Sequence, residues 1–151
     1  MALDLQKVTI RKLLETQNHD FFTKLVPQFF TGANTGLYSK IENFYKAHLK
    51  LPSVEEMIMI NKDEAIQEYL ESQILGEDNY VPNIENDFLV SQLQDFFVRE
   101  ETITFLDKFV DDLEDLEKIE IIDKFQDHLL RICNTRISFI RWKKRFWKIY
   151  Y

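Results

Sequence analysis

The sequence contains few residues that break helices: only three glycines and three prolines among 151 residues. A sheet of many short strands needs frequent turns, which glycine and proline usually supply. Their scarcity argues against such a sheet and favours helices. The hydrophobic fraction of 45%, with 13 phenylalanines, is enough for a buried core. We therefore expect an all-α fold.

Other absences bear on where the protein works. The single cysteine, Cys133, cannot form a disulfide within the chain, which fits a reducing cytoplasm. No run of 18 apolar residues is present, so no transmembrane helix is expected. The N-terminal residues lack the basic and apolar regions of a secretory signal. We expect a cytoplasmic protein.

Patterns typical of enzymes and metal sites are also missing. None of the glycines precedes a lysine, so the sequence has no phosphate-binding GxxxxGK[ST] loop. His128 and Cys133 are five residues apart, which places them on different faces of a helix. Glu100 and Glu101 fit an exposed helix surface better than an acid–base pair. We expect no enzyme activity, no metal ion and no cofactor.

The strongest pattern lies between residues 83 and 137, where apolar residues recur at the helical steps of three, four or seven. They are Leu89, Leu93, Phe96, Ile103, Leu106, Val110 and Leu113 in a first segment, then Leu116, Ile119, Ile122, Phe125 and Leu129 in a second. The acidic residues 111–115 separate the segments. This pattern predicts two long helices joined by a tight turn into an antiparallel hairpin.

Residues 5–75 predict about five shorter helices. Ser53 and Glu56 form a capping-box pattern at the start of a helix over 54–60. Pro27 interrupts a phenylalanine-rich segment, so a kink or a split is expected there. Residues 31–36 contain two glycines and predict a break before a helix beginning at Leu37.

The expected architecture is a small globular helical bundle followed by a long antiparallel helical hairpin. We expect the bundle over residues 1–82, the hairpin of the same domain over 83–137, and a basic aromatic tail over 138–151.

The predicted hairpin has more apolar surface than a single partner helix can cover, since one neighbour covers a stripe about 100° wide. Soluble monomers rarely expose the remainder, so we expect an association surface. Its expected residues are Phe96, Phe97, Ile103, Val110, Ile119, Ile122 and Phe125. The expected assembly is a homo-oligomer, either a dimer through the hairpin or a higher oligomer.

Charge is unevenly distributed along the chain. Residues 1–128 hold 26 acidic and 12 basic residues, a balance of −14, whereas residues 129–151 hold seven basic residues and no acid. The body should therefore repel nucleic acid, and the tail should attract it. Single-stranded DNA would contact Arg141, Trp142, Lys143, Lys144, Arg145 and Lys148. Alternatively, the tail lies on an anionic membrane surface or docks its tryptophans onto the body.

A family resemblance is carried mainly by residues 21–57, which read FFTKLVPQFFTGANTGLYSKIENFYKAHLKLPSVEEM. An aromatic pair precedes a phenylalanine-rich helix, and a break and a second aromatic helix follow, ending in KLPS. The later hairpin segment carries Phe97 and Arg99. In this order of elements, residues 8–137 resemble the N-terminal domain of DnaB-type hexameric replicative helicases, most closely those of large tailed phages.

The resemblance implies a role in DNA replication. In that family the N-terminal domain forms a collar on the ring, pairs with neighbouring subunits through its hairpins, and contacts primase or helicase loaders. A separate ATPase domain is the motor. Because the phosphate loop is missing here, the resemblance implies a non-catalytic module, which a phage would place in the bacterial host cytoplasm. Such a chain would be a fragment, the product of a truncated gene or a stand-alone relative.

Two other functions stay open. The chain is alternatively a stand-alone adaptor or inhibitor that binds a full-length helicase and mimics one collar subunit. A third function is single-stranded nucleic-acid binding that depends on the tail.

Overall fold

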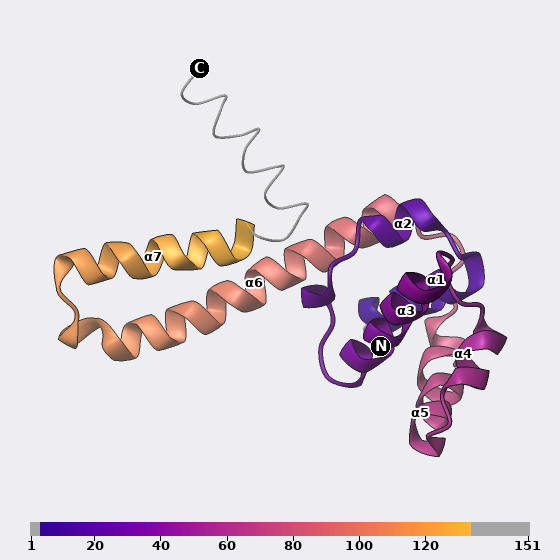
Figure 1. The fold of residues 1–151 in the computed structure, drawn as a ribbon. Coiled ribbons are helices and arrows are strands. Elements are labelled where there is room, and N and C mark those ends of the chain that lie inside the picture. Colours follow the sequence, from indigo (N-terminus) through magenta and orange to yellow (C-terminus); the bar gives the residue numbers. More distant parts are fainter. Residues whose placement is uncertain (1–3, 134–151) are drawn as a thin grey trace. The chain divides into compact units, whose positions relative to one another are not determined.

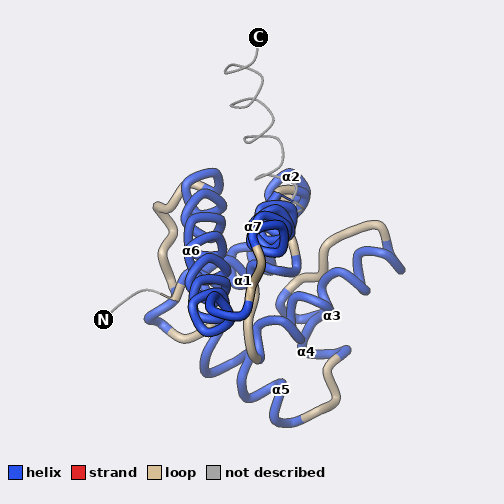
Figure 2. The backbone as a smooth tube through the Cα atoms, turned by 90° about the vertical axis from the view of Figure 1, so that its left-hand side faces the viewer, coloured by secondary structure: helices blue, strands red, loops and turns tan. Residues whose placement is uncertain are grey.

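The computed structural model describes residues 4–133, and within this range it contains helices and turns but no strand. The expected all-α fold is confirmed (Figure 1). The chain separates into two compact units, residues 1–93 and 94–151. The backbone of both units can be followed in Figure 2.

The first unit contains mostly short helices. They are α1 (Leu5–Thr16), α2 (His19–Thr23), α3 (Ala33–His48), α4 (Val54–Ile60), α5 (Glu64–Tyr69) and the start of α6 (Asn86–Asp112). Two 3₁₀ turns (Pro27–Phe29 and Glu77–Asn79) and a π-helical turn (Leu70–Ile74) complete it.

A single apolar core holds these elements together. Its fully buried side chains come from α1 to α4, the π-helical turn and the start of α6: Val8, Ile10, Leu13, Leu14, Phe21, Ile41, Met57, Leu70, Ile74, Leu89 and Leu93. Burial of each such side chain contributes roughly 1.5–3 kcal/mol. Because Leu89, Val90 and Leu93 belong to this core, the first unit extends through residue 93, beyond the bundle boundary expected at residue 82.

The ends of the helices follow from local side-chain chemistry. The Asp4 carboxylate accepts hydrogen bonds from the backbone N–H groups of Gln6 and Lys7 at the start of α1. The capping box of Ser53 and Glu56 is present at the start of α4. Pro27 divides the phenylalanine-rich segment, since α2 stops at Thr23 and a separate 3₁₀ turn begins at Pro27.

Two helices end in a left-handed cap residue that is not glycine. The caps after α1 and α3 are Gln17 and Leu49, which adopt left-handed backbone conformations with φ of 49° and 56°. Their backbone N–H groups donate to the carbonyls of Leu13 and Tyr45.

The prediction of a break over residues 31–36 is wrong in part, because α3 begins at Ala33. Gly32, with φ of 59°, makes the turn alone. The next residues are held in the helix by side-chain contacts: Asn34 donates to Gln6, and the Thr35 hydroxyl donates to the Phe30 carbonyl. These contacts outweigh the low helix propensity of the segment.

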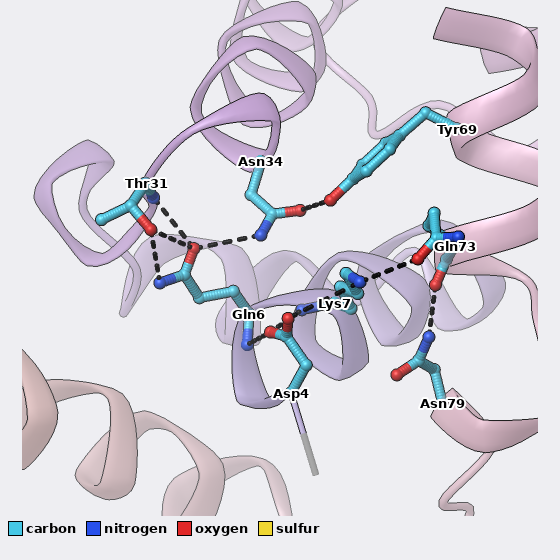
Figure 3. A network of polar contacts seen from close by, with 8 residues as sticks. All are labelled: Asp4, Gln6, Lys7, Thr31, Asn34, Tyr69, Gln73 and Asn79. Carbon is cyan, nitrogen blue, oxygen red and sulfur yellow. Dashed lines mark hydrogen bonds and ion pairs between the residues drawn. The ribbon is translucent and has the colours of Figure 1, made fainter. Parts of the chain in front are cut away.

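A buried polar network ties α1 to α3 and α5 (Figure 3). The Gln6 Oε1 atom accepts from the backbone N–H of Thr31 at 2.9 Å and from Asn34 Nδ2 at 3.1 Å. The Tyr69 hydroxyl donates to Asn34 Oδ1 at 2.9 Å. Asn34 therefore uses both ends of its amide inside the core.

The second unit is a helical hairpin. It contains the remainder of α6, a 3₁₀ turn (Leu113–Asp115) and α7 (Lys118–Cys133). Helix α7 runs back alongside α6 (Figure 1). Among residues 4–133, no helix is both long enough and apolar enough to cross a membrane.

We expect Asn34→Ala to destabilise the first unit by about 1–3 kcal/mol, because the Tyr69 hydroxyl loses its acceptor and Gln6 Oε1 keeps only its hydrogen bonds from Thr31. The free energy of unfolding is measured by urea denaturation. Asn83→Ala is the matched control, because Asn83 is exposed, and it should leave the value nearly unchanged. Equal values for both variants would show that the network contributes nothing to stability.

Candidate association surface

An aromatic seam holds α6 against α7. Phe105 stacks on the His128 ring with centroids 4.3 Å apart and planes 9° apart. Phe125 meets Phe105 and Phe109 edge-on, with centroids 5.2 and 4.9 Å apart. Such pairs add about 0.5–1.5 kcal/mol beyond the burial of their area. The seam therefore fixes which sides of the two helices face each other.

Two ion pairs flank the seam. Lys124 Nζ lies 3.1 Å from Asp112 Oδ2, and an Arg131 nitrogen lies 3.5 Å from Glu101 Oε2. Both pairs are partly exposed, so each contributes about 1 kcal/mol or less. They support the antiparallel alignment that the rings establish.

His128 is the buried titratable group of the seam, with 7% of its surface exposed. Its Nε2 atom lies 3.4 Å from the Thr102 hydroxyl, and its Nδ1 atom is buried without a hydrogen-bond partner among the described residues. Burial lowers the pKa of His128, Arg131 lowers it further, and Glu101 opposes both effects. The neutral imidazole is therefore the form that the folded hairpin favours.

Away from the seam, the hairpin exposes a continuous set of large apolar side chains. Val110 is 64% exposed and Ile119 is 61% exposed, although each lies in a helix packed against another. We call this set the open face. Its members are Phe96, Ile103, Leu106, Val110 and Leu113 from α6 and Ile119, Ile122, Phe125 and Leu129 from α7.

Helix geometry places the open-face residues of α6 and those of α7 on the same side of the hairpin. Each residue turns an α-helix by about 100°. We measure the rotation about each helix axis, toward the C-terminus, from the seam residues Phe105 on α6 and His128 on α7. By this measure most of the open-face residues lie at roughly 80–180° on both helices. Because the helices are antiparallel, equal turns in the same sense point to one side. The two stripes therefore form one two-helix surface.

The opposite side of the hairpin is acidic. The carboxylates that turn in the other sense from the seam are Glu100, Asp107 and Asp111 on α6 and Glu120, Asp123 and Asp127 on α7. The open face itself carries few charges: Asp95 and Arg99 lie near its Phe96 end, and Lys118 lies near the turn. Repulsion between like charges therefore does not oppose contact between two open faces.

The predicted interface residues mostly lie on this surface. Phe96, Ile103, Val110, Ile119 and Ile122 are exposed, and Phe125 is shared between the seam and the open face. Phe97 is only 8% exposed and so does not lie on the open face. Leu106, Leu113 and Leu129 were not predicted as interface residues, although they continue the same steps of three and four.

A small groove on the other side of the seam is the main alternative site. It has a volume of about 280 Å³ and is lined by Thr104, Phe105, Lys108, Phe109, Lys124, Asp127, His128 and Arg131. Two of its three cations already pair with Asp112 and Glu101.

The described residues contain no group of His, Cys, Asp and Glu that could hold a metal ion. The expected nucleic-acid residues of the tail, between Arg141 and Lys148, lie outside the described residues.

The seam predicts a pH-dependent stability. The unfolded chain takes up a proton on His128 near pH 6.5, whereas the folded hairpin resists it because the pKa is lowered. The contribution of His128 to stability is fully present above pH 6.5 and is lost as the pH falls below 6.5 toward the lowered pKa of the folded hairpin. We expect His128→Gln to reduce this loss, measured by urea denaturation at each pH. His48→Gln, at an exposed position, is the control, and an unchanged loss in His128→Gln would assign the effect to other groups.

Comparison with known proteins adds no identification. No family model, curated protein or solved structure matches the chain. The similarity to helicase collar domains therefore rests on the sequence features quoted above and stays a prediction.

Proposed function

We propose that this chain is a non-catalytic helical module of DNA replication that joins neighbouring chains through the open face of its hairpin. In this role it resembles the collar domains of DnaB-type helicases, which also recruit primase or a helicase loader. The observation that carries the proposal is the continuous apolar surface formed by α6 and α7 together.

The size of the open face supports association. A large apolar side chain presents on the order of 150 Å² when fully exposed. The nine open-face side chains are each about half exposed, so together they present on the order of 700 Å². One partner of a stable protein–protein interface contributes about 800 Å². Monomeric soluble proteins rarely expose an apolar surface of this size.

The order of elements supports the collar role. A bundle of short helices is followed by a long two-helix hairpin, the order found in the domains that the sequence resembles. Phe97 and Arg99 carry the resemblance in the hairpin. Phe97 is buried and Arg99 lies on the open face, so one supports the hairpin and the other is available to a partner.

A heterotypic partner is the second candidate, because an apolar two-helix face also fits the corresponding face of a full-length helicase. In that case the chain acts as an adaptor or inhibitor that replaces one collar subunit. The two candidates differ in what the purified chain does alone, since only the first requires self-association. Binding of single-stranded DNA by the tail is a separate proposal on residues outside the described range.

We expect Val110→Asp to shift the protein from dimer to monomer. The substitution removes roughly 1.5–3 kcal/mol of apolar burial from each copy and places a charge in the interface, so the dissociation constant should rise at least ~10-fold. Mass in solution is measured by light scattering over a range of concentrations, and circular dichroism monitors the helix content.

Thr104→Asp is the matched control for Val110→Asp. It introduces the same charge at an exposed position of the same helix, but outside the open face. It should leave the dissociation constant unchanged. If the unmodified protein is monomeric at high micromolar concentration, self-association through the open face is refuted.

The replication role has its own test. The unmodified chain should bind a replicative primase or helicase loader from the same source without any need for ATP, measured by isothermal titration calorimetry. It should show no magnesium-dependent ATP hydrolysis, because it lacks a phosphate loop. If the chain dimerises but binds neither protein, the proposed self-association is supported and the proposed collar role is refuted.

A further inference from the structure

The groove beside the aromatic seam has the composition of a small ligand site. It lies between α6 and α7, on the side of the seam away from the open face. Its volume of about 280 Å³ is close to the lower end of the range for small-molecule pockets, about 300–1,000 Å³. The rings of Phe105, Phe109 and His128 form its apolar part, and cationic side chains form most of its charged part.

His128 supplies the observation that points to a ligand. Its side chain lines the groove and is only 7% exposed. Its Nδ1 atom has no hydrogen-bond partner among the described residues, and its Nε2 atom has only a long contact of 3.4 Å with the Thr102 hydroxyl. Buried polar atoms are nearly always hydrogen-bonded, so an unpaired ring nitrogen beside a groove indicates a bound group that completes it.

Three cations surround this histidine. Lys124 lies four residues before His128 and Arg131 three residues after it, so both lie on its face of α7. Lys108 follows Phe105, the residue that stacks on His128, by three residues on α6. All three cations line the groove. Their long side chains can move to admit a ligand and then contact it.

The carboxylates paired with these cations leave them with hydrogen-bond donors for a ligand. Lys124 lies 3.1 Å from Asp112, and Arg131 lies 3.5 Å from Glu101. A lysine has three N–H donors and an arginine has five, so one carboxylate does not saturate either. Lys108 takes part in neither ion pair. An anion can therefore bind all three cations while the two pairs persist.

The wider charge distribution limits the size of the anion. Asp127 is the one carboxylate among the described lining residues, against three cations, which gives a formal balance of +2. The other carboxylates of the acidic side, such as Glu100 and Asp107, are exposed and are screened by salt beyond about 8 Å. A long polyanion would run along these carboxylates and be repelled, whereas a small anion contacts only the groove.

Protonation of His128 is linked to the binding of such an anion. Burial and Arg131 lower the pKa of His128, and an anion against the ring raises it, because an opposite charge favours the charged imidazolium. The other charged groups around the ring come from both helices: Glu101, Lys108 and Asp112 on α6 and Lys124 and Asp127 on α7.

We propose that this groove binds a small phosphate-bearing molecule, whose phosphate oxygens accept a hydrogen bond from His128 Nδ1 and pair with Lys108, Lys124 and Arg131. The site is independent of the proposed self-association, since it lies on the other side of the seam from the open face. Because the cations come from both helices, a bound phosphate links α6 to α7 and stabilises the hairpin.

Proton NMR of the full chain tests the site with two probes, pyrophosphate and a nucleoside diphosphate. Each probe should shift the ring signals of His128 and raise its pKa, measured by pH titration. His19 and His48, in the first unit, are internal controls and should not respond. Such shifts with either probe support the proposal, and the tighter probe identifies the source as free diphosphate or nucleotide. No shift of the His128 signals at millimolar concentrations of both probes overturns it.

A charge-removing variant locates the binding. Lys108→Gln should weaken pyrophosphate binding at least several-fold by isothermal titration calorimetry, with helix content unchanged by circular dichroism. Lys118→Gln is the matched control, because it removes the same charge from an exposed position of the same hairpin, near the turn and outside the groove. Equal affinities for both variants would assign the binding to other cations, such as those of the sequence 138–151, and would overturn the proposal.

Sulfate tests the link to protonation, because its charge does not change between about pH 6 and about pH 8, where histidine titrates. The unmodified chain should bind sulfate several-fold more tightly at the lower pH, since the lysines and arginine stay charged throughout. His128→Gln should lose this difference. Equal affinity of the unmodified chain at both pH values would contradict the hydrogen bond from His128.

Discussion

The second unit depends on the contact of four rings, Phe105 and Phe109 from α6 with Phe125 and His128 from α7. The rings use only one side of each helix. Within residues 94–133, the hairpin has no third helix to cover another side, so the remaining apolar side chains lie at its surface. The open face is therefore a direct result of where the seam lies.

The two surfaces of the hairpin have different chemistry, and this difference limits how copies can meet. The acidic side carries most of the carboxylates of α6 and α7 and keeps the hairpin hydrated. The open face carries few charges, so its burial involves little loss of charge hydration. Association through the acidic side would place like charges together, so the self-association that we propose uses the open face.

Much of the fold could be predicted because helices leave a periodic record in the sequence. The steps of Ile103, Val110 and Leu113 identified the hairpin, and the pairing of Ser53 with Glu56 identified the start of α4. Periodicity specifies spacing, however, and does not specify which of two neighbouring stripes meets the partner helix. Phe96 and Phe97 are adjacent in sequence, yet the first is exposed and the second is buried.

Features that depend on distant contacts could not be read from local patterns. The start of α3 at Ala33 requires Asn34 to reach Gln6, 28 residues earlier in the chain. The boundary at Leu93 lies inside a continuous helix and is set by burial against the core of the first unit. The stacking of His128 on Phe105 likewise joins residues of two helices, and no local motif marks it.

The near absence of glycine has a consequence for the unfolded chain. Gln17 and Leu49 occupy left-handed positions where glycine is usual, which costs each helix end about 1–2 kcal/mol in backbone strain. Residues with side chains sample fewer backbone conformations when unfolded than glycine does. The protein therefore accepts strain at these two native positions and gives up less conformational entropy when it folds.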